Sequence, residues 1–511
     1  MLGRPVRHYR QGSRMSLARV ATRCRQGISA STVWVEAHLS PGLPTIALVG
    51  ASATVVKDAK ERVRSAIISS GYRWPDARLT ISFSPAGVHQ ATASLDLPIA
   101  VAILIASRQI PATLADGAEF YGELGLDGRI LATSGLLAAG ASQREPSVTL
   151  ITPSDNAPAI AALCDNVVGL ANLGDLRAPQ RWSQSVPRDD KSTSNGRSVS
   201  PVPLPAGQPG LWRASEIAAT GGHHMLMSGE PGAGKTMAAT LIKQLLPELS
   251  HREALETQII FDIANQVPPE GRVFQSPHHS ISVAGLVGGT RQATPGEISL
   301  AHHGVLFLDE LPEFSLATIE ALRQPLEAGE IRISRSEHSH SYPAKFQLIA
   351  AMNPCPCGYR DSPTTPCRCS VSALSRYNQK LSGPLLDRID LFISVNRSKL
   401  SDVMSPQNQL LDDLKKAQHR VAMARASAMK RQGAENSRIA GGDLMMLCAL
   451  SSATKQWLER TGERLQLSGR GLHRCLRVAR TIADLSEQQE VTQFELSEAL
   501  VYRAHLGQTG A

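Results

Sequence analysis

The chain lacks a hydrophobic run long enough to cross a membrane. Its longest apolar stretches, such as residues 97–106, are much shorter than the roughly 20 residues of a transmembrane helix. No apolar segment follows the basic start of the chain, which excludes a secretory signal. Internal repeats and heptads are also absent. We therefore expect a globular, cytoplasmic protein without a membrane partner.

Acidic side chains are missing before Glu36, whereas arginines are frequent there. The seven arginines are Arg4, Arg7, Arg10, Arg14, Arg19, Arg23 and Arg25. We expect residues 1–16 to be a disordered extension, and a transit peptide or a nucleic-acid-binding arm are the alternatives. The net charge of +8 over 511 residues favours a polyanionic partner without identifying it.

The order of composition and periodicity along the chain predicts several domains. Residues 17–182 alternate short apolar runs with helical spacing, which is typical of an α/β domain. Residues 183–209 are rich in Ser, Pro, Asp and Gly and predict a linker. Residues 210–398 are expected to form a second α/β domain. Residues 399–511 are expected to form a helical domain, with helical apolar spacing at 410–429 and 472–485.

Individual elements can also be predicted. The expected elements are strands at 32–35, 45–49, 79–83, 225–227, 304–308 and 346–352, helices at 59–70, 237–246, 410–429 and 472–485, and a buried helix or strand at 97–106.

A glycine-rich loop between an expected strand and an expected helix carries the clearest chemistry. Its residues are Gly229, Glu230, Pro231, Gly232, Ala233, Gly234, Lys235 and Thr236. This is the phosphate-loop pattern, in which backbone N–H groups and a helix N-terminus surround phosphate oxygens. Lys235 would reach the β- and γ-phosphates of ATP, and Thr236 would bind Mg²⁺.

Polar residues end two later strands. Asp309 and Glu310 follow the apolar run 304–308, so Asp309 would hold Mg²⁺ and Glu310 would activate the attacking water. Asn353 ends the strand at 346–352. It is either a contact to the γ-phosphate or the lytic water, or a turn residue before Pro354.

These residues resemble an AAA+ ATPase of the magnesium-chelatase-like branch, and more narrowly the ComM family of competence-associated ATPases. The matching stretches are residues 43–50, 61–72, 95–104, 216–224, 295–314, 322–335, 350–360 and 477–485. The resemblance covers residues 15–505. It implies a Lon-protease-like (S5 domain 2-like) first domain, an AAA+ core and a C-terminal helical lid.

The resemblance also implies a homo-hexameric ring with ATP at each subunit interface. Arg388 matches the arginine finger that acts on the neighbouring subunit, although an exposed arginine paired with an aspartate is the alternative. Arg470 matches the sensor-2 arginine of the lid, with Arg474 as its rival. The helix-2 insert of this branch falls within 273–298, where glycines suit a loop that points into the ring pore.

Four cysteines lie close together in a Pro- and Gly-containing loop. They are Cys355, Cys357, Cys367 and Cys369. Four thiols have the ligand count of a structural Zn²⁺ site, and free thiols or redox pairing remain open. His278 and His279 could also be ligands, but we leave them unassigned.

The first domain departs from the family that it resembles. It has His89–Gln90–Ala91 where the family usually has Lys-Glu-Gly, and no convincing Ser–Lys pair is present, so proteolysis is not expected.

The expected function is therefore that of an ATP-hydrolysing motor on DNA, associated by family with branch migration of recombination intermediates in natural transformation. A basic helix around residues 411–431 fits backbone-directed DNA binding, although a solvated charged face is the alternative. A magnesium-chelatase motor subunit and a protein-remodelling ATPase are the alternative functions.

Overall fold

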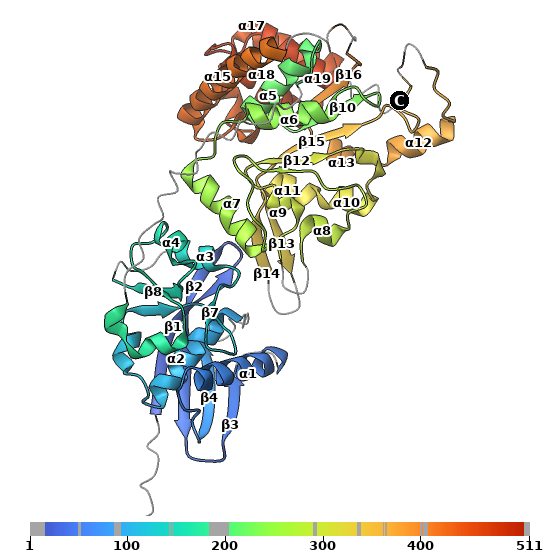
Figure 1. Cartoon of the computed structure of the whole chain (residues 1–511). Helices are drawn as coiled ribbons and strands as arrows, with labels where there is room; N and C mark the ends of the chain where they lie inside the picture. The colour runs from blue at the N-terminus through green and yellow to red at the C-terminus, as the bar shows by residue number, and fades with distance from the viewer. Residues whose placement is uncertain are drawn as a thin grey trace, which may run out of the picture. The chain divides into compact units, whose positions relative to one another are not determined.

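The computed structural model describes residues 16–49, 53–85, 93–142, 145, 147–182, 204–289, 294–334, 339–360, 362, 365–398, 401 and 407–504 (Figure 1). The chain divides into two compact units, one of residues 1–197 and 261–267 and the other of residues 198–260 and 268–511. The expected extension 1–16 (apart from Ser16), most of the expected linker, and His89–Ala91 lie outside the described residues.

A mixed seven-stranded sheet forms the first unit. Its order is β3-β4-β2-β1-β5-β8-β9. The strands are β1 (Ser16–Gln26), β2 (Ser29–Ser40), β3 (Thr45–Val49), β4 (Arg78–Ser84), β5 (Ala118–Phe120), β8 (Thr149–Pro153) and β9 (Val167–Leu170), with a separate pair β6 (Glu123–Leu124) and β7 (Ile130–Leu131). The helices are α1 (Ala53–Ser69), α2 (Asp96–Ala106), α3 (Leu136–Ala141) and α4 (Ala157–Ala161).

Helix α2 resolves the choice that the sequence left open for residues 97–106. All its residues are buried, because an uninterrupted apolar run has no polar face to turn toward water. Its first residue, Asp96, accepts a hydrogen bond from Arg62 Nε at 2.6 Å. Burial raises the pKa of Asp96 to about 6, against the opposing effect of Arg62.

Strand β1 was not predicted, because its arginines hide its apolar alternation. Arg19, Arg23 and Arg25 lie in this strand, and Arg23 is buried. Arg23 Nε donates to Glu119 Oε2 at 2.9 Å. These three arginines therefore belong to the sheet rather than to a basic arm.

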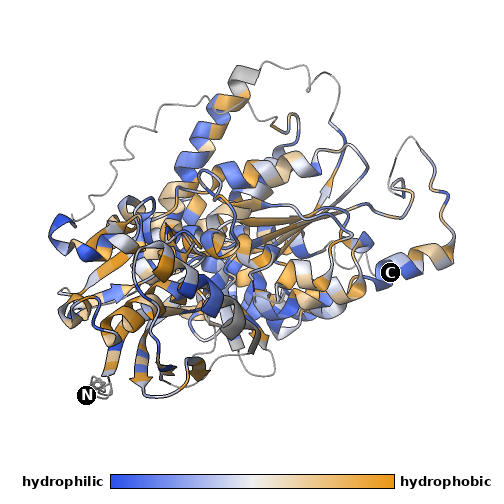
Figure 2. Ribbon diagram, turned by 60° about the horizontal axis from the view of Figure 1, so that its bottom comes forward, coloured by the Kyte–Doolittle hydropathy of each residue, from blue (hydrophilic) through white to orange (hydrophobic). Residues whose placement is uncertain are grey.

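A parallel five-stranded sheet forms the centre of the second unit. Its order is β11-β12-β15-β10-β16, and every pair in it is parallel. The strands are β10 (Met225–Gly229), β11 (Phe274–Gln275), β12 (Val305–Leu308), β15 (Gln347–Met352) and β16 (Leu391–Val395), and β13 (Glu330–Ser334) pairs with β14 (Ser339–Pro343) in a hairpin. The sheet strands carry the hydrophobic colour in Figure 2, as expected for a sheet covered on both faces.

Helices surround this sheet and continue to the end of the described chain. They are α5 (Pro209–Gly221), α6 (Lys235–Leu245), α7 (His251–Ile263), α8 (Val283–Val287), α9 (Glu297–Leu300), α10 (Leu316–Ala321), α11 (Arg323–Ala328), α12 (Val371–Gln379), α13 (Gly383–Leu386), α15 (Gln407–Gln432), α16 (Leu444–Cys448), α17 (Ser452–Arg464), α18 (Gly469–Leu485) and α19 (Gln493–Ala504). The helices from α15 onward share one hydrophobic core with α5, α6 and the sheet. No helix within the described residues is both long and apolar enough to span a bilayer.

Candidate active site

The phosphate loop lies at the carboxyl end of β10, in the conformation that its glycines allow. Gly232 and Gly234 have φ angles of +77° and +93°, which side-chain-bearing residues rarely adopt. A Cβ on Gly229 would lie 2.3 Å from the carbonyl oxygen of Val395 on β16, so the loop needs glycine there for close packing. Helix α6 begins directly at Lys235, so its free N–H groups face the loop.

Lys235 is held inside the loop by three acceptors. Its Nζ donates to the carbonyl oxygens of Gly229 (2.6 Å) and Glu230 (3.2 Å) and to Asn353 Oδ1 (2.9 Å). Burial lowers the pKa of Lys235, while Asp309 and Glu310 oppose that shift. The bond to Lys235 places the Asn353 side chain at the phosphate loop.

The hydroxyl of Thr236 and the carboxylate of Asp309 lie close enough to share one metal ion. Thr236 Oγ1 donates to Asp309 Oδ2 at 3.5 Å. Adjacent oxygen ligands of an octahedral Mg²⁺ with bonds of about 2.1 Å stand about 3 Å apart, so this pair fits Mg²⁺. The ion would supply charge to neutralise the phosphate oxygens.

Glu310 follows Asp309 in a left-handed conformation, with φ of +51°. Its Oε2 lies 3.6 Å from Nδ1 of His279, which the sequence left unassigned. The ring of His279 also contacts that of His278, with centroids 4.0 Å apart and the planes tilted by 35°. The carboxylate that is expected to activate water thus has a histidine neighbour, and no sequence motif marked this pair.

Two further residues hold the loop and carry no motif. Gln208 Nε2 donates to the carbonyl oxygen of Ala233 (2.9 Å) and to Ser398 Oγ (2.8 Å). Arg397 donates to the carbonyl oxygen of Pro231 at 3.3 Å. Gln208 belongs to the segment expected to be a linker, so its contact could not be predicted from composition.

Arg388 lies at the opposite edge of the sheet from the phosphate loop. It lines a cavity of about 450 Å³ with His224, Gly304, Gln347 and Asp390, which precede or begin four of the parallel strands. The cavity therefore lies at the amino edge, whereas Lys235 lies at the carboxyl edge. Arg388 pairs with Glu327, but its Nε is buried without a hydrogen-bond partner.

Arg470 and Arg474 line a smaller cavity beside Arg388, of about 180 Å³. Arg474 forms an ion pair with Asp390 and donates to the carbonyl oxygen of Arg388 at 3.0 Å. Arg470 is exposed and makes no hydrogen bond or ion pair with any described residue. Of the two rival arginines, Arg470 is therefore the one free to meet a ligand, and Arg474 supports the backbone of Arg388.

Asp390 connects this edge to helix α18. It is buried and accepts from His223 Nδ1 (3.3 Å), while His223 Nε2 contacts Thr481 Oγ1 (2.8 Å). Burial acts to raise the pKa of Asp390, but the hydrogen bond from His223 and the charge of Arg474 outweigh it and hold the pKa well below its usual range.

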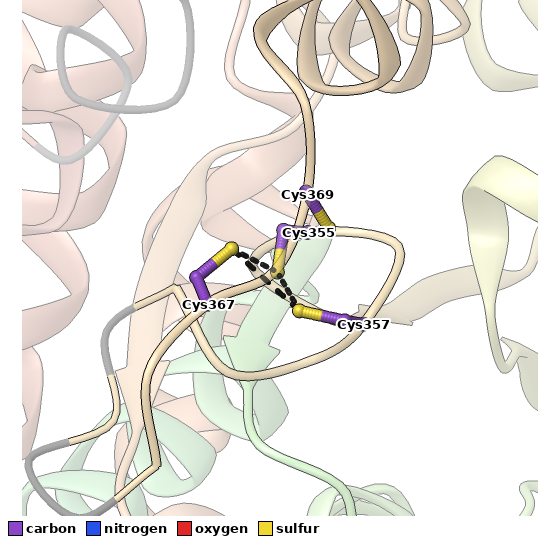
Figure 3. Close-up of side chains that lie close together, drawn as sticks. All are labelled: Cys355, Cys357, Cys367 and Cys369. Carbon is purple, nitrogen blue, oxygen red and sulfur yellow. Dashed lines mark hydrogen bonds between the residues drawn. The ribbon is translucent and has the colours of Figure 1, made fainter.

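The four cysteines follow Asn353 and converge, as Figure 3 shows. The sulfur of Cys355 lies 3.3 Å from that of Cys357 and 3.7 Å from that of Cys367, and the sulfurs of Cys357 and Cys367 are 3.6 Å apart. All four sulfurs, including that of Cys369, lie within 4.8 Å of one another. None is in a disulfide. The arrangement has the composition of a tetrathiolate metal site.

A second group of ligand-type residues, Glu256, His302 and His303, is better explained without a metal. Burial lowers the pKa of His302 to about 4, so its ring is neutral near pH 7. Its Nδ1 accepts from the backbone N–H of Lys345 at 3.0 Å, which leaves the proton on Nε2. That Nε2 lies 3.2 Å from Glu256 Oε2 and donates to it, so it has no lone pair for an ion.

The basic helix expected around residues 411–431 is α15, and its arginines have internal partners. Arg420 pairs with Glu216, and Arg425 pairs with Glu435. Arg431 binds both carboxylate oxygens of Asp484, at 2.7 and 2.8 Å. These arginines stabilise the helical packing. Lys416 pairs with Asp413 at 4.0 Å, whereas Lys415 and Lys430 have no ion pair within the described part of the chain.

Three family models match the chain. The magnesium chelatase subunit ChlI model matches residues 205–403, the model for subunit ChlI of Mg-chelatase matches residues 35–156, and the ChlI C-terminal model matches residues 413–503. With its phosphate loop and parallel sheet, the protein is an AAA+ ATPase of the magnesium-chelatase type, a class that uses ATP and Mg²⁺.

Two full-length relatives define the family more narrowly. The uncharacterized protein YifB of Escherichia coli K12 is 40% identical over 510 residues, covering 96% of this chain and 97% of YifB. The competence protein ComM of Haemophilus influenzae is 38% identical over 507 residues, covering 96% of this chain and 98% of ComM. The chain belongs to the ComM/YifB family.

Proposed function

We propose that the protein is a ring-forming motor, expected to be hexameric, that hydrolyses ATP between adjacent subunits and moves DNA. One observation carries the proposal: Lys235, Asp309 and Asn353 meet at the carboxyl edge of the sheet, while Arg388 and Arg470 line cavities at the amino edge. One chain cannot bring both sets to the same phosphate. A neighbouring copy can, because head-to-tail contacts place opposite faces of adjacent subunits together.

The proposal assigns these roles to the residues of one interface. Lys235 and the loop N–H groups would bind the phosphates, Thr236 and Asp309 would hold Mg²⁺, and Glu310 would accept a proton from water. Asn353 would orient the γ-phosphate or that water. Arg388 and Arg470 of the neighbouring subunit would stabilise the charge of the transition state.

DNA is the proposed cargo, and branch migration during transformation is the proposed activity. The net charge of +8 and the likeness to a protein named for competence support it. The helix-2 insert adds a structural argument. Gly288 and Gly289 pack on Ile333 of the β13–β14 hairpin, where added Cβ atoms would lie 3.2 and 3.3 Å from its methyl groups. Insert and hairpin would thus move together as the pore element.

The first unit is proposed to have the Lon-protease-like fold without proteolytic activity. The ChlI subunit model matches much of this unit, which supports the fold. The proposal also includes a structural Zn²⁺ at the four cysteines.

ATPase stimulation by DNA tests the proposal. Forked or four-way DNA should raise the turnover of the wild-type chain, and the effect should fade between about 50 mM and about 200 mM salt, because binding to backbone phosphates releases counterions. The Lys235→Ala chain is the control without turnover. A rate that DNA leaves unchanged at every salt concentration would instead favour a chelatase subunit or a protein remodeller.

A further inference from the structure

The sulfurs of the four cysteines lie within 4.8 Å of one another, a spacing that suits a single metal ion. We propose that Cys355, Cys357, Cys367 and Cys369 bind one Zn²⁺, and that this ion holds the phosphate loop and Asn353 in register. Three sulfur pairs are 3.3, 3.6 and 3.7 Å apart. Tetrahedral zinc with bonds of about 2.3 Å places its sulfurs about 3.8 Å apart. An iron–sulfur cluster, which spreads its thiolates over several irons, needs a wider cage.

Backbone N–H groups surround the sulfurs as they do at thiolate sites. The N–H groups of Tyr359 and Arg360 point at the sulfur of Cys355, and that of Cys357 points at the sulfur of Cys369. Such donors stabilise the negative charge of a metal-bound thiolate and orient it. A disulfide requires sulfurs about 2.05 Å apart, so the cage is not a pair of closed disulfides.

The site is tied to the nucleotide machinery on both of its flanks. Cys355 stands two residues after Asn353. Asn353 is held by its bond with Lys235 and by the bond from Tyr377 Oη to its carbonyl oxygen, 3.1 Å. Tyr377 lies on α12, which begins two residues after Cys369. One ion would therefore fix both the strand that carries Asn353 and the helix that holds it.

Gly358, the residue after Cys357, packs directly against the phosphate loop. Its φ is +85°, and a Cβ there would lie 2.8 Å from Cδ of Pro231. The loop can approach this closely only with glycine at 358. Loss of the ion would free Gly358 and Asn353 together, so that nucleotide binding weakens. This coupling rests on the proposed ATPase function, whereas the metal site does not.

Metal analysis tests the site without any activity. The purified full-length chain should contain one zinc, Cys357→Ser and Cys369→Ser should lose most of it, and Cys164→Ser, a cysteine outside the cluster, should keep it. Because ligand variants of a zinc site can fail to fold, zinc release from the wild-type chain is also measured. A mercurial that titrates the thiols should release one zinc per chain to a zinc indicator. Substoichiometric zinc, with no uptake of added zinc, would overturn the site.

A glycine pair tests the coupling. Gly358→Ala should keep its zinc yet bind a fluorescent ATP analogue at least several-fold more weakly than the wild-type chain. Gly433→Ala is the matched control, because Gly433 also has a left-handed φ, +70°, but an added Cβ would meet nothing within 4 Å. Equal affinity in the two variants would refute the coupling and leave the metal site standing. A chain that binds zinc and never hydrolyses ATP would instead refute the proposed function alone.

Discussion

Replacing Arg388 with alanine should abolish ATP turnover while leaving ATP binding to the same chain intact. Arg388 lines the amino-edge cavity, and the strands between it and Lys235 are parallel, so its guanidinium cannot reach the phosphate loop of its own chain. The role proposed for Arg388 therefore requires a neighbouring subunit. Arginines of this kind contribute about 10³–10⁵ in kcat, so Arg388→Ala should fall near the background rate.

Mixing two inactive variants then becomes a decisive assay. A Lys235→Ala chain keeps Arg388, and an Arg388→Ala chain keeps its phosphate loop. In equal, random mixing, about a quarter of the interfaces of a closed ring combine the intact loop of one chain with the intact arginine of the next. The rate of phosphate release, averaged over all interfaces, should therefore recover to about a quarter of the wild-type rate.

An arginine outside the two amino-edge cavities provides the control. Arg464→Ala, an exposed arginine in α17, should retain wild-type turnover and shows that loss of an arginine alone is harmless. If mixtures at every ratio release phosphate no faster than the sum of the separate variants, Arg388 does not act across an interface. The division of the site between two edges would then have to be abandoned.

Three further outcomes are expected. Glu310→Gln should bind ATP but not hydrolyse it in a steady-state assay, because the amide cannot accept the proton of water. His279→Ala should change kcat with little effect on ATP affinity, since His279 contacts Glu310, whereas His278→Ala, which leaves that contact in place, should change kcat less. Asp390→Asn should lower the free energy of unfolding by about 3–5 kcal/mol, because it leaves Arg474 partly buried without its partner. The folded-state pKa of Asp390 lies below its unfolded value of about 3.9, so its stabilisation is present above that pH and is lost as the pH falls further. The free energy of unfolding should therefore depend less on pH in the acid range in Asp390→Asn than in the wild-type chain.

The phosphate site was predictable because its chemistry is local in sequence. The glycines of residues 229–234 determine a loop, the next residues start a helix, and Asp309 and Asn353 each end a short apolar strand. Carboxyl ends of adjacent parallel strands meet at one edge, so their proximity follows from the pattern alone. The zinc-type cage was predictable for the same reason, since its ligands lie within one loop.

Partners that come from distant parts of the chain could not be predicted. The cationic face of α15 looked suited to DNA, but Arg420 pairs with Glu216, and Arg431 pairs with Asp484. Nothing near residue 420 or 431 indicates those acids. Strand β1 was missed in a similar way, because the buried Arg23 is neutralised by Glu119, which lies far along the chain.

Strand β16 joins the two halves of the proposed interface within one subunit. Before it, Asp390 binds Arg474 of α18, and Arg474 in turn supports the backbone of Arg388. At its other end, Val395 packs against Gly229, and Arg397 donates to the phosphate loop. A shift of α18 that moves Arg388 therefore also displaces the strand that backs the phosphate loop. Packed strands transmit displacement rather than absorb it. Nucleotide binding at the phosphate loop of one subunit would therefore shift Arg388 of the same subunit, which in the proposed ring acts on the next subunit.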